Sequence, residues 1–394
     1  MTTTPTPSTG PDPTAGLTAW AEIDLAAIRD NVRSLRERSV PGTLMAVVKA
    51  DAYGHGLVPV ARAALVGGAD YLGVAQLEEA IGLREQGVTA PLLAWLFAPG
   101  ARLGRALELD IEISVASRGA LDAVLAAARE TGRTARVHLK VDTGLGRGGA
   151  FGADWDDLVQ AVAALAAEEA VAVVGVFSHF ILADAPQHPS VLAQQETFAR
   201  AVSRLEAAGV RPGIRHLANS AATLTNPGAH LDMVRPGLAL YGLSPVPDLG
   251  HPEDFGLREA MRLVARAVLV KDLPAGQGVS YGHTYTTDAD TTVALVPLGY
   301  GDGVPRAGGN VAPVQVGGER LSVSGRVCMD QLVVDTHRRV HVEPGDEIVL
   351  WGRHADGEPT AQDWAQATGT INYEIVTRLG GRVPRVLRGT GVLA

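Results

Sequence analysis

Short apolar runs alternate with Ala- and Leu-rich segments over about residues 44–242. The segments between the runs, such as 121–130 and 192–208, place apolar residues at helical spacing and contain few helix breakers. This alternation predicts repeated β-α units whose strands pair in parallel. The runs, about eight in number, are 44–50, 71–75, 91–96, 111–116, 137–142, 173–179, 214–219 and 233–241. They predict an α/β fold, a closed (β/α)8 barrel of the TIM type, with its active site where the strands end.

The pattern changes after about residue 254 to alternating β-branched and polar residues that are interrupted by Gly and Pro. Expected strands are 264–270, 292–296, 312–316, 321–328 and 347–351, with a short helix at 363–367. The sequence therefore predicts a disordered tail at 1–16, a barrel at 17–254 and a mostly β C-terminal domain at 255–394.

The composition favours a globular protein with small-molecule ligands. Its 394 residues exceed what one hydrophobic core usually contains. A net charge of −9, without a run of like charge, argues against nucleic acid or an acidic membrane surface as a partner. The single cysteine, Cys328, excludes an internal disulfide and an all-cysteine metal site, so we expect a reducing cytoplasm and no metal. The first sixteen residues lack the basic start and apolar core of a signal peptide.

Polar residues occur where the apolar runs stop. The first run ends in Lys49, followed by Tyr53 and His55 between glycines. Burial lowers the pKa of a lysine and makes its amine nucleophilic, which suits a Schiff base with an aldehyde cofactor. The alternative is a lysine whose side chain extends out of the barrel rim into water.

A second lysine, Lys140, ends the fifth run and points inward with the same parity as His138 and Asp142. An isolated buried ammonium is costly, so Lys140 needs an ion pair with Asp142 or a modification that removes its charge. Later runs end in further polar residues that we expect at the same barrel face: His179, His216, Asn219 and Arg235.

Two later positions suggest a phosphate site. Ser220 opens a helical segment, where it serves either as an N-cap or as a phosphate ligand. Gly237 follows the last run and allows backbone N–H groups to approach a ligand.

These residues, in this order, resemble the alanine racemase family from about Ala19 to Val386. The block from Val48 to Gly56 (VKADAYGHG) is similar to the family's cofactor-lysine motif. Further similar blocks are WAEIDL from Trp20, VSYG from Val279, LGYGDG from Leu298, GRVCMD from Gly325 and INYE from Ile371. The resemblance implies a pyridoxal 5'-phosphate (PLP) enzyme of barrel-plus-β architecture that acts as a homodimer.

The family pattern implies a role for each matching residue. Lys49 would carry PLP as an internal aldimine, and Arg235 would face the pyridine nitrogen. Lys49 and Tyr281 would be the two bases on opposite faces of the substrate, with Tyr281 supported by His179 and contributed by the other subunit. The remaining implied cofactor contacts are Tyr53, His179, Asn219, Ser220, Gly237, Leu238 and Tyr373.

The resemblance also implies a substrate site. Lys140 would be carbamylated and would orient Arg147, which together with Met329 and Tyr281 would receive the substrate carboxylate. The access passage is expected to involve Asp184, Tyr300, Arg306, Arg326 and Tyr373. Departures from the family pattern are Leu145 where Met is common, Ile181 and Leu182 where small residues are usual, and one inserted residue between Tyr300 and Met329.

The resemblance implies racemisation of L- and D-alanine, which in a cell would supply D-alanine as a peptidoglycan precursor. A racemase for serine or several amino acids is the nearest alternative, and a role in tolerance of a D-alanine-mimicking antibiotic stays open. A PLP decarboxylase is disfavoured because an acidic residue would face the pyridine nitrogen where Arg235 is expected. A non-catalytic PLP-binding protein would not need Tyr281, Met329 and Tyr373.

Overall fold

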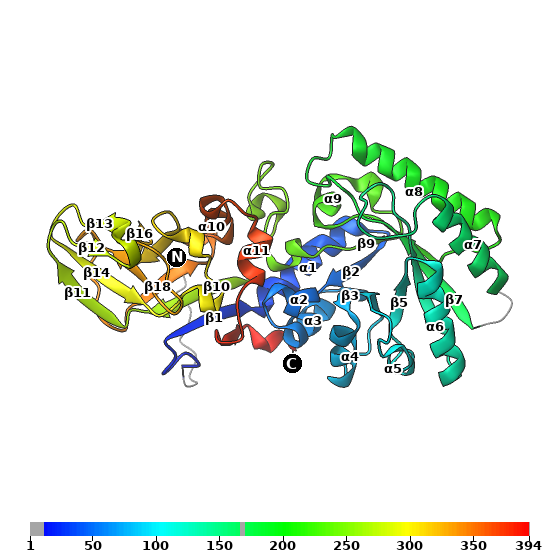
Figure 1. Ribbon diagram of the computed structural model, residues 1–394, viewed down its shortest axis with the longest axis horizontal. Helices are drawn as coiled ribbons and strands as arrows, with labels where there is room; N and C mark the ends of the chain where they lie inside the picture. Colours follow the sequence, from blue (N-terminus) through cyan, green and yellow to red (C-terminus); the bar gives the residue numbers. More distant parts are fainter. Residues whose placement is uncertain (1–11, 166–169, 394) are drawn as a thin grey trace, which may run out of the picture. The chain divides into compact units, whose positions relative to one another are not determined.

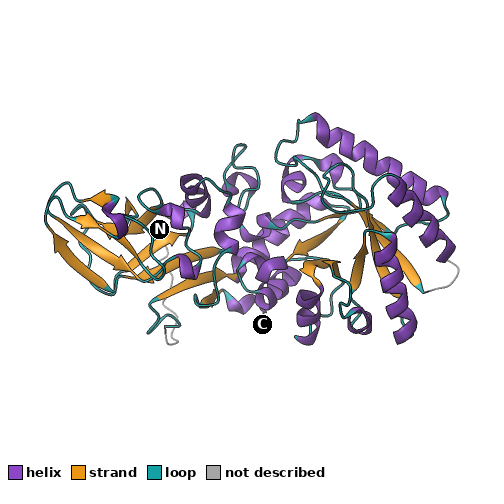
Figure 2. Cartoon of the chain, in the orientation of Figure 1, coloured by secondary structure: helices purple, strands orange, loops and turns teal. Residues whose placement is uncertain are grey.

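The computed structural model describes residues 12–165 and 170–393, which form two compact units. The barrel unit contains residues 24–260 and 389–393, and the β unit contains residues 12–23 and 261–388. Strands and helices alternate in the barrel unit, whereas strands dominate the β unit (Figure 1, Figure 2). The predicted barrel followed by a mostly β domain is confirmed. The proposed disordered tail lies outside the described residues over 1–11.

The described part of the barrel unit contains one eight-stranded parallel sheet in the order β8-β7-β6-β5-β4-β3-β2-β9. Hydrogen bonds from Asp232 N to Arg215 O (3.1 Å) and from Arg235 N to Ala218 O (2.8 Å) join the two terminal strands and close the barrel. The strands are β2 (Thr43–Val47), β3 (Tyr71–Gln76), β4 (Leu92–Leu96), β5 (Glu112–Val115), β6 (Ala135–Lys140), β7 (Val171–Phe177), β8 (Ile214–His216) and β9 (Met233–Val234).

Helices lie around the outside of these strands (Figure 1). Helix α1 starts where Asp24 Oδ1 accepts a hydrogen bond from Ala27 N (3.0 Å), and α6 starts where Ser117 Oγ accepts from Ala120 N (3.2 Å). The helices are α1 (Leu25–Ser39), α2 (Lys49–Tyr53), α3 (Leu57–Val66), α4 (Leu77–Glu85), α5 (Leu103–Glu108), α6 (Arg118–Thr131), α7 (Ala153–Leu165), α8 (Pro189–Ala207) and α9 (Ser220–Thr225).

The last apolar run differs from its prediction as one strand over 233–241. Strand β9 ends at Val234, and residues 238–241 form the 3-10 helix η2 (Leu238–Tyr241). Pro236 and Gly237 separate the two elements, since proline cannot donate to a strand ladder. The C-terminal part of this run therefore belongs to a loop at the strand ends.

The β unit contains, within its described residues, sheets of six, three and two strands. Their orders are β16-β15-β18-β10-β1-β19, β11-β14-β17 and β12-β13. The elements are β1 (Ala19–Asp24), β10 (Met261–Arg266), β11 (Leu269–Leu273), β12 (Gly278–Val279), β13 (Tyr285–Thr286), β14 (Thr291–Val296), β15 (Pro313–Val316), β16 (Glu319–Ser322), β17 (Leu332–Asp335), β18 (Glu347–Trp351), β19 (Arg385–Arg388), α10 (Ala361–Thr368) and α11 (Asn372–Thr377).

Two predicted strands of the β unit differ in extent. The run 264–270 is divided between β10 and β11, which belong to different sheets. The run 321–328 is a strand only up to Ser322, because Gly325 turns the chain with φ of +81°. Residues 326–328 are thereby free to form a loop.

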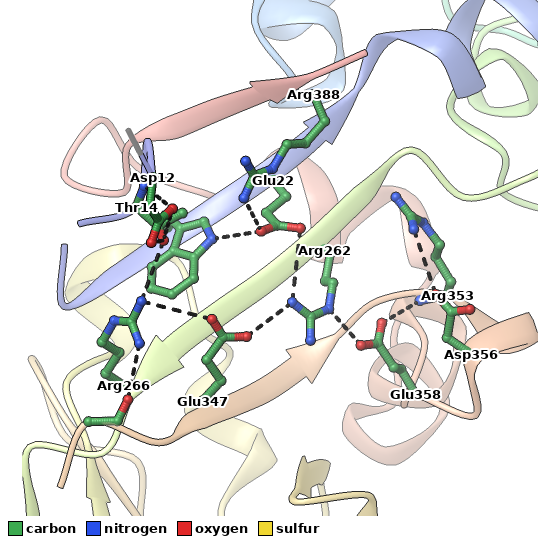
Figure 3. Close-up of polar contacts among 12 residues, drawn as sticks. Asp12, Thr14, Glu22, Arg262, Arg266, Glu347, Arg353, Asp356, Glu358 and Arg388 are labelled. Carbon is green, nitrogen blue, oxygen red and sulfur yellow. Dashed lines mark hydrogen bonds and ion pairs between the residues drawn. The ribbon is translucent and has the colours of Figure 1, made fainter. Parts of the chain in front are cut away.

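Strand β1 belongs to the sheet of the β unit, although the sequence analysis assigned residues 17–23 to the barrel. It pairs antiparallel with β10, and ion pairs reinforce the sheet (Figure 3). Arg262 contacts carboxylates of Glu22 (3.9 Å), Glu347 (3.5 Å) and Glu358 (2.6 Å). The division between the units also falls at 260/261 rather than at the expected 254/255, because β10 begins at Met261.

Residues 12–16, predicted as part of the disordered tail, form a turn in the structure. Asp12 Oδ1 accepts hydrogen bonds from Thr14 N (2.9 Å) and Thr14 Oγ1 (2.8 Å), and Thr14 is buried. Arg266 Nη2 donates to Thr14 Oγ1 (3.4 Å), which attaches this turn to β10.

Candidate active site

Four basic side chains and one histidine gather at the carboxyl ends of the barrel strands. Lys49 follows β2, Lys140 ends β6, His179 follows β7, Arg235 follows β9, and Arg147 lies in the loop after β6. The positive charges of Arg147 and Arg235 act on the pKa values of Lys140 and His179, so these groups share one electrostatic environment. The structure therefore brings together the barrel residues that the strand ends predicted, with Arg147 added as the family pattern implied. An anionic ligand would relieve their mutual repulsion.

Lys49 is the first residue of a strained turn. Ala50, Asp51, Ala52 and Tyr53 all have positive φ, between 51° and 55°. Each such residue costs about 1–2 kcal/mol, so the surrounding structure must hold the turn in place.

Two carboxylates stabilise that turn. Glu79 Oε1 accepts from Ala50 N (2.6 Å), and Asp51 Oδ1 accepts from Leu57 N (2.8 Å). Burial, and then the charge of Arg147, lower the pKa of the Lys49 amine, while Glu79 opposes this effect. Lys49 is thus a fixed amine that loses its proton more readily than an ordinary lysine.

Lys140 has no hydrogen-bonded carboxylate among the residues that the structure describes. Asp142 instead accepts at Oδ1 from Gly144 N (2.8 Å) and Gly146 N (3.2 Å) and holds the following loop. Burial, together with Arg147 and Arg235, lowers the pKa of Lys140 to about 8. The ion pair with Asp142 that we considered from the sequence is therefore not formed, although Asp142 still raises this pKa through its charge.

Arg235 is buried and held on two sides. Its Nη1 lies 3.1 Å from His216 Nδ1, and its Nη2 donates to the carbonyl oxygens of Ser178 (2.6 Å) and Leu217 (3.3 Å). Burial lowers the pKa of Arg235 to about 9, which leaves the guanidinium charged at neutral pH. Burial and then Arg235 lower the pKa of His179 to about 3, so His179 is neutral and supplies a hydrogen-bonding group rather than a charge.

The residues expected to bind the phosphate lie around Gly237, whose backbone comes close to the Tyr53 hydroxyl. A Cβ atom on Gly237 would lie 2.3 Å from Tyr53 Oη, so no side chain fits at this position. Ser220 Oγ accepts from Gly237 N (2.8 Å) and Ala239 N (3.3 Å), which places one hydroxyl and two backbone amides together. Asn219 caps α9 by accepting from Ala222 N at Oδ1 (3.1 Å), and Leu238 is buried at the start of η2.

The sequence analysis missed Gln194, a buried amide on α8 that joins two strand-end loops. Its Nε2 donates to Thr143 Oγ1 (3.0 Å) and to His179 O (3.1 Å), and its Oε1 accepts from Ile181 N (2.9 Å). A lone Gln in an Ala-rich helix is a weak signal, because most such residues face water. Of the expected passage residues in this unit, Asp184 is exposed in the same loop as Ile181.

The expected residues of the β unit form a separate group. Tyr281 is 72% exposed and Met329 is 54% exposed. Ser280 Oγ, next to Tyr281, donates to Arg326 O (2.7 Å), and Tyr300 N donates to Cys328 O (3.0 Å). These bonds attach the Tyr281 and Tyr300 turns to the loop that carries Met329.

The other passage residues of the β unit lie close to this group or on nearby elements. The Arg326 guanidinium would be 3.4 Å from a Cβ atom on Gly282, so it lies beside the Tyr281 turn. Arg306 is exposed in a 3-10 turn, and Tyr373 is half-buried on α11.

Two kinds of feature are absent from the described part of the chain. It contains no group of three or more His, Cys, Asp or Glu side chains placed to hold a metal ion. None of its helices combines the length and apolar character that a membrane span requires.

Comparison with known proteins covers almost the whole chain. Residues 23–245 match the model of the alanine racemase N-terminal domain, and residues 260–387 match that of the C-terminal domain. The alanine racemase of Salinispora arenicola is 57% identical over 372 residues, which cover 94% of this chain and 98% of that protein. The enzyme of Streptomyces coelicolor is 54% identical and covers 95% and 97% of the two chains.

Solved structures similar to this chain are also alanine racemases. The crystal structure of alanine racemase from D-cycloserine-producing Streptomyces lavendulae has a TM-score of 0.93 at 54% identity, covering 94% of this chain and 97% of that one. The Bacillus anthracis alanine racemase with bound L-Ala-P has a TM-score of 0.85 at 35% identity, with 95% and 96% coverage. The chain therefore belongs to the alanine racemase family, whose members are PLP-dependent isomerases.

Proposed function

We propose that this chain interconverts L-alanine and D-alanine with PLP as its cofactor. The observation that carries the proposal is the Lys49 amine, which sits on a strained turn at the end of a barrel strand, with a lowered pKa, among basic groups. The relatives named alanine racemase, at 54–57% identity over nearly the whole chain, support the substrate.

The barrel residues suit PLP. Tyr53 Oη and Ser220 Oγ would bind the phosphate together with nearby backbone amides, and a glycine at position 237 leaves room for the Tyr53 hydroxyl beside them. Tyr373 and Asn219 are further proposed cofactor contacts. The Arg235 guanidinium would face the pyridine nitrogen and keep it unprotonated, because two cations in contact repel.

Racemisation requires proton transfer on opposite faces of one carbon, so two groups are needed. PLP, when bound, supplies an aldehyde for the amino group and a ring that withdraws electrons from Cα. Lys49 Nζ exchanges the proton on one face, since its lowered pKa favours the free amine. Tyr281 Oη exchanges the proton on the other face, and His179, neutral in this environment, orients that hydroxyl.

We place Tyr281 in the site of a partner subunit within a homodimer. The β unit exposes three large side chains, those of Tyr281, Tyr300 and Met329. Such a group of exposed apolar side chains is unusual unless another protein surface covers it. Met329 would meet the substrate carboxylate there together with Arg147. Mixing Lys49→Ala with Tyr281→Phe protein tests this arrangement, because each mixed dimer would contain one competent site.

Lys140 is proposed to be carbamylated. Its pKa of about 8 leaves a fraction of free amine at neutral pH. That amine attacks CO2, a C–N bond forms, and the proton leaves to solvent, so the lysine becomes a carbamate anion. The anion would pair with Arg147 and offset the surplus positive charge. A carbamate resonance in the 13C NMR spectrum after exchange with 13CO2, lost in Lys140→Met, is the expected result.

Strictness for alanine depends on the loop around Ile181 and Leu182, whose side chains are larger than is usual in the family. The access passage is proposed to involve Asp184, Tyr300, Arg306, Arg326 and Tyr373. A broader racemase acting on serine is the second candidate. Comparing kcat/KM for L-alanine and L-serine separates the two candidates. An apolar pocket by itself rejects a substrate with one added hydroxyl only weakly, so a strong preference for alanine would show a site built to exclude serine.

We propose a cytoplasmic location on the basis of the cysteine content. The single cysteine is compatible with a reducing cytoplasm, and D-alanine produced there would serve as a peptidoglycan precursor.

The decisive experiment is incubation of the PLP-loaded protein with L-alanine and measurement of D-alanine. Appearance of D-alanine up to an equal mixture of both enantiomers is expected. A protein that binds PLP but forms no D-alanine would be a non-catalytic carrier.

A further inference from the structure

A chain of hydrogen bonds crosses the interior of the barrel and ends at Arg235. Glu112 Oε2, on β5, lies 2.8 Å from His138 Nε2, on β6. His138 Nδ1 lies 2.8 Å from His216 Nε2, on β8, and His216 Nδ1 lies 3.1 Å from Arg235 Nη1. All four side chains are buried, and Glu112 is 2% exposed. Neither the proton transfers nor the cofactor contacts proposed above use Glu112 or His138.

The chemistry of the two ends fixes the direction of every hydrogen bond. A guanidinium has only donors, so Arg235 must donate to His216 Nδ1. The proton of a neutral His216 is then on Nε2, which donates to His138 Nδ1. For the same reason the proton of His138 is on Nε2, which donates to Glu112. An ionised carboxylate has only acceptors, so the sequence of donors ends correctly at Glu112.

The opposite direction is excluded by the same groups. A proton on His138 Nδ1 would make His216 Nε2 an acceptor, and a neutral His216 would then carry its proton on Nδ1. That proton would point at Arg235, which cannot accept it. A doubly protonated His138 leads to the same conflict, so both imidazoles are neutral.

Packing holds the two imidazoles in this geometry. A Cβ atom on Gly175, on β7, would lie 2.5 Å from His138 Nδ1, so the glycine makes room for the bond between the histidines. The Phe177 ring stacks on His216 with centroids 4.8 Å apart and an angle of 13°. Tyr71 meets His138 edge-on at 6.5 Å. Neither imidazole ring can rotate without displacing one of these neighbours.

Glu112, at the end of these hydrogen bonds away from Arg235, stays ionised. Arg136 donates to Glu112 Oε1 from Nε (2.9 Å) and Nη2 (2.6 Å), while Oε2 accepts from His138. Burial raises the pKa of Glu112, but its hydrogen bonds with His138 and Arg136 and the positive charge of Arg136 lower it below its ordinary value. Glu112 is therefore a carboxylate at neutral pH, as the direction of the chain requires.

We propose that Glu112 is a positioning residue for the reaction, because its carboxylate accepts the last of these hydrogen bonds and thereby stabilises the tautomers of His138 and His216 that hold the Arg235 guanidinium. With Nη1 on His216 and Nη2 on two carbonyl oxygens, Arg235 makes no hydrogen bond from Nε within the described residues, so Nε–H is available to a ligand. The inference rests on the proposed place of Arg235 at the pyridine nitrogen. Glu112 would act there through two histidines, without touching substrate or cofactor.

The first test is neutron diffraction from perdeuterated crystals of the PLP-loaded enzyme, which locates hydrogen directly. Deuterium on Nε2 of both His138 and His216, with none on either Nδ1, is the expected result. Deuterium on Nδ1 of either ring overturns the proposal. This experiment uses the wild-type protein, so it tests the two tautomers even if a Glu112 variant fails to fold.

The second test compares Glu112→Gln with Ser114→Ala. A glutamine whose oxygen stays with Arg136 turns its NH2 toward His138 and opposes the native direction. We expect kcat for alanine to fall about tenfold or more while KM changes little, as for other residues that orient a contact group. Abortive transamination, in which the proton returns to the cofactor carbon rather than to Cα, should rise. Wild-type kinetics in a folded Glu112→Gln protein would refute the proposal.

Ser114 is the matched control because it lies two residues along the same strand and is equally buried. Its Oγ makes no hydrogen bond within the described residues, so its loss should leave kcat and the fraction of transamination unchanged. The role of Arg235 is tested separately with Arg235→Lys. If that variant shows no rise in transamination while the neutron result holds, the assignment at the pyridine nitrogen fails and the Glu112 tautomer control stands.

Discussion

The functional residues of the barrel unit and those of the β unit occupy opposite environments. Lys140 and Arg235 lie in the barrel among groups that perturb their pKa values strongly. Tyr281 and Met329 are largely exposed on the β unit, in turns stabilised by hydrogen bonds to the backbone. The barrel thus contains groups whose charge is set by burial. Those of the β unit are held in exposed turns, and under the proposed function they would acquire their electrostatic environment in an assembled site.

Lys49→Ala should cause the largest loss, because the barrel then lacks its only proposed amine base. We expect racemisation to fall by at least about 10⁴-fold, the upper range for loss of a general base. The chain has three lysines, at positions 49, 140 and 271. Borohydride reduction followed by peptide mass spectrometry should therefore find PLP on Lys49 in wild type. Exposed Lys271→Ala is the control, and full activity in Lys49→Ala would remove this residue from the mechanism.

Tyr281→Phe is expected to lower kcat by about 10²–10⁴-fold, because only the phenol oxygen is lost. The side chain lies on the exposed surface of the β unit, so the free energy of unfolding should change little. PLP absorbance should persist, in contrast to Lys49→Ala. Equal kcat values in Tyr281→Phe and wild type would show that the second base lies elsewhere.

Gly237→Ala tests whether the barrel site is shaped for a phosphate. The added Cβ would lie 2.3 Å from Tyr53 Oη and force the two segments apart. A strain of about 1–3 kcal/mol corresponds to a Kd for PLP that is weaker by roughly fivefold to 150-fold. Fluorescence titration of the apoenzyme with PLP measures this change. Gly119→Ala, where nothing lies within 4 Å of the new Cβ, should bind PLP like wild type.

A smaller effect concerns the response of the barrel to acid. The pKa of His179 is lowered from 6.5 to about 3, so the unfolded chain binds a proton there that the folded chain does not. The free energy of unfolding should therefore fall as the pH decreases from about 6.5 toward 3, by at most about 1.4 kcal/mol per pH unit for this one group. Urea unfolding at about pH 7 and pH 5 should show a shallower decline in His179→Gln. An equal decline in both proteins would mean that His179 titrates normally.

The sequence predicted the parts of this protein whose signals are local. Apolar runs located seven of the eight barrel strands within a few residues and the start of the eighth at Met233, because side-chain periodicity directly reflects which face is buried. Lys49, Lys140 and Arg235 were identified because charged residues at the ends of such runs have no ordinary place in a core, whereas Arg147 came from the resemblance to the family. The family blocks then suggested PLP and the second base.

Only the tertiary structure decided which distant residues meet. Strand β1 belongs to the sheet of the β unit because its hydrogen bonds go to β10, more than two hundred residues away in the chain. Glu112 and Gln194 resemble ordinary surface residues in the sequence, yet both are buried and hydrogen-bonded. Protonation states depend on such contacts, since burial and neighbouring charges set a pKa. The sequence therefore determined which reactive groups are present, and folding determined the charge that each one carries.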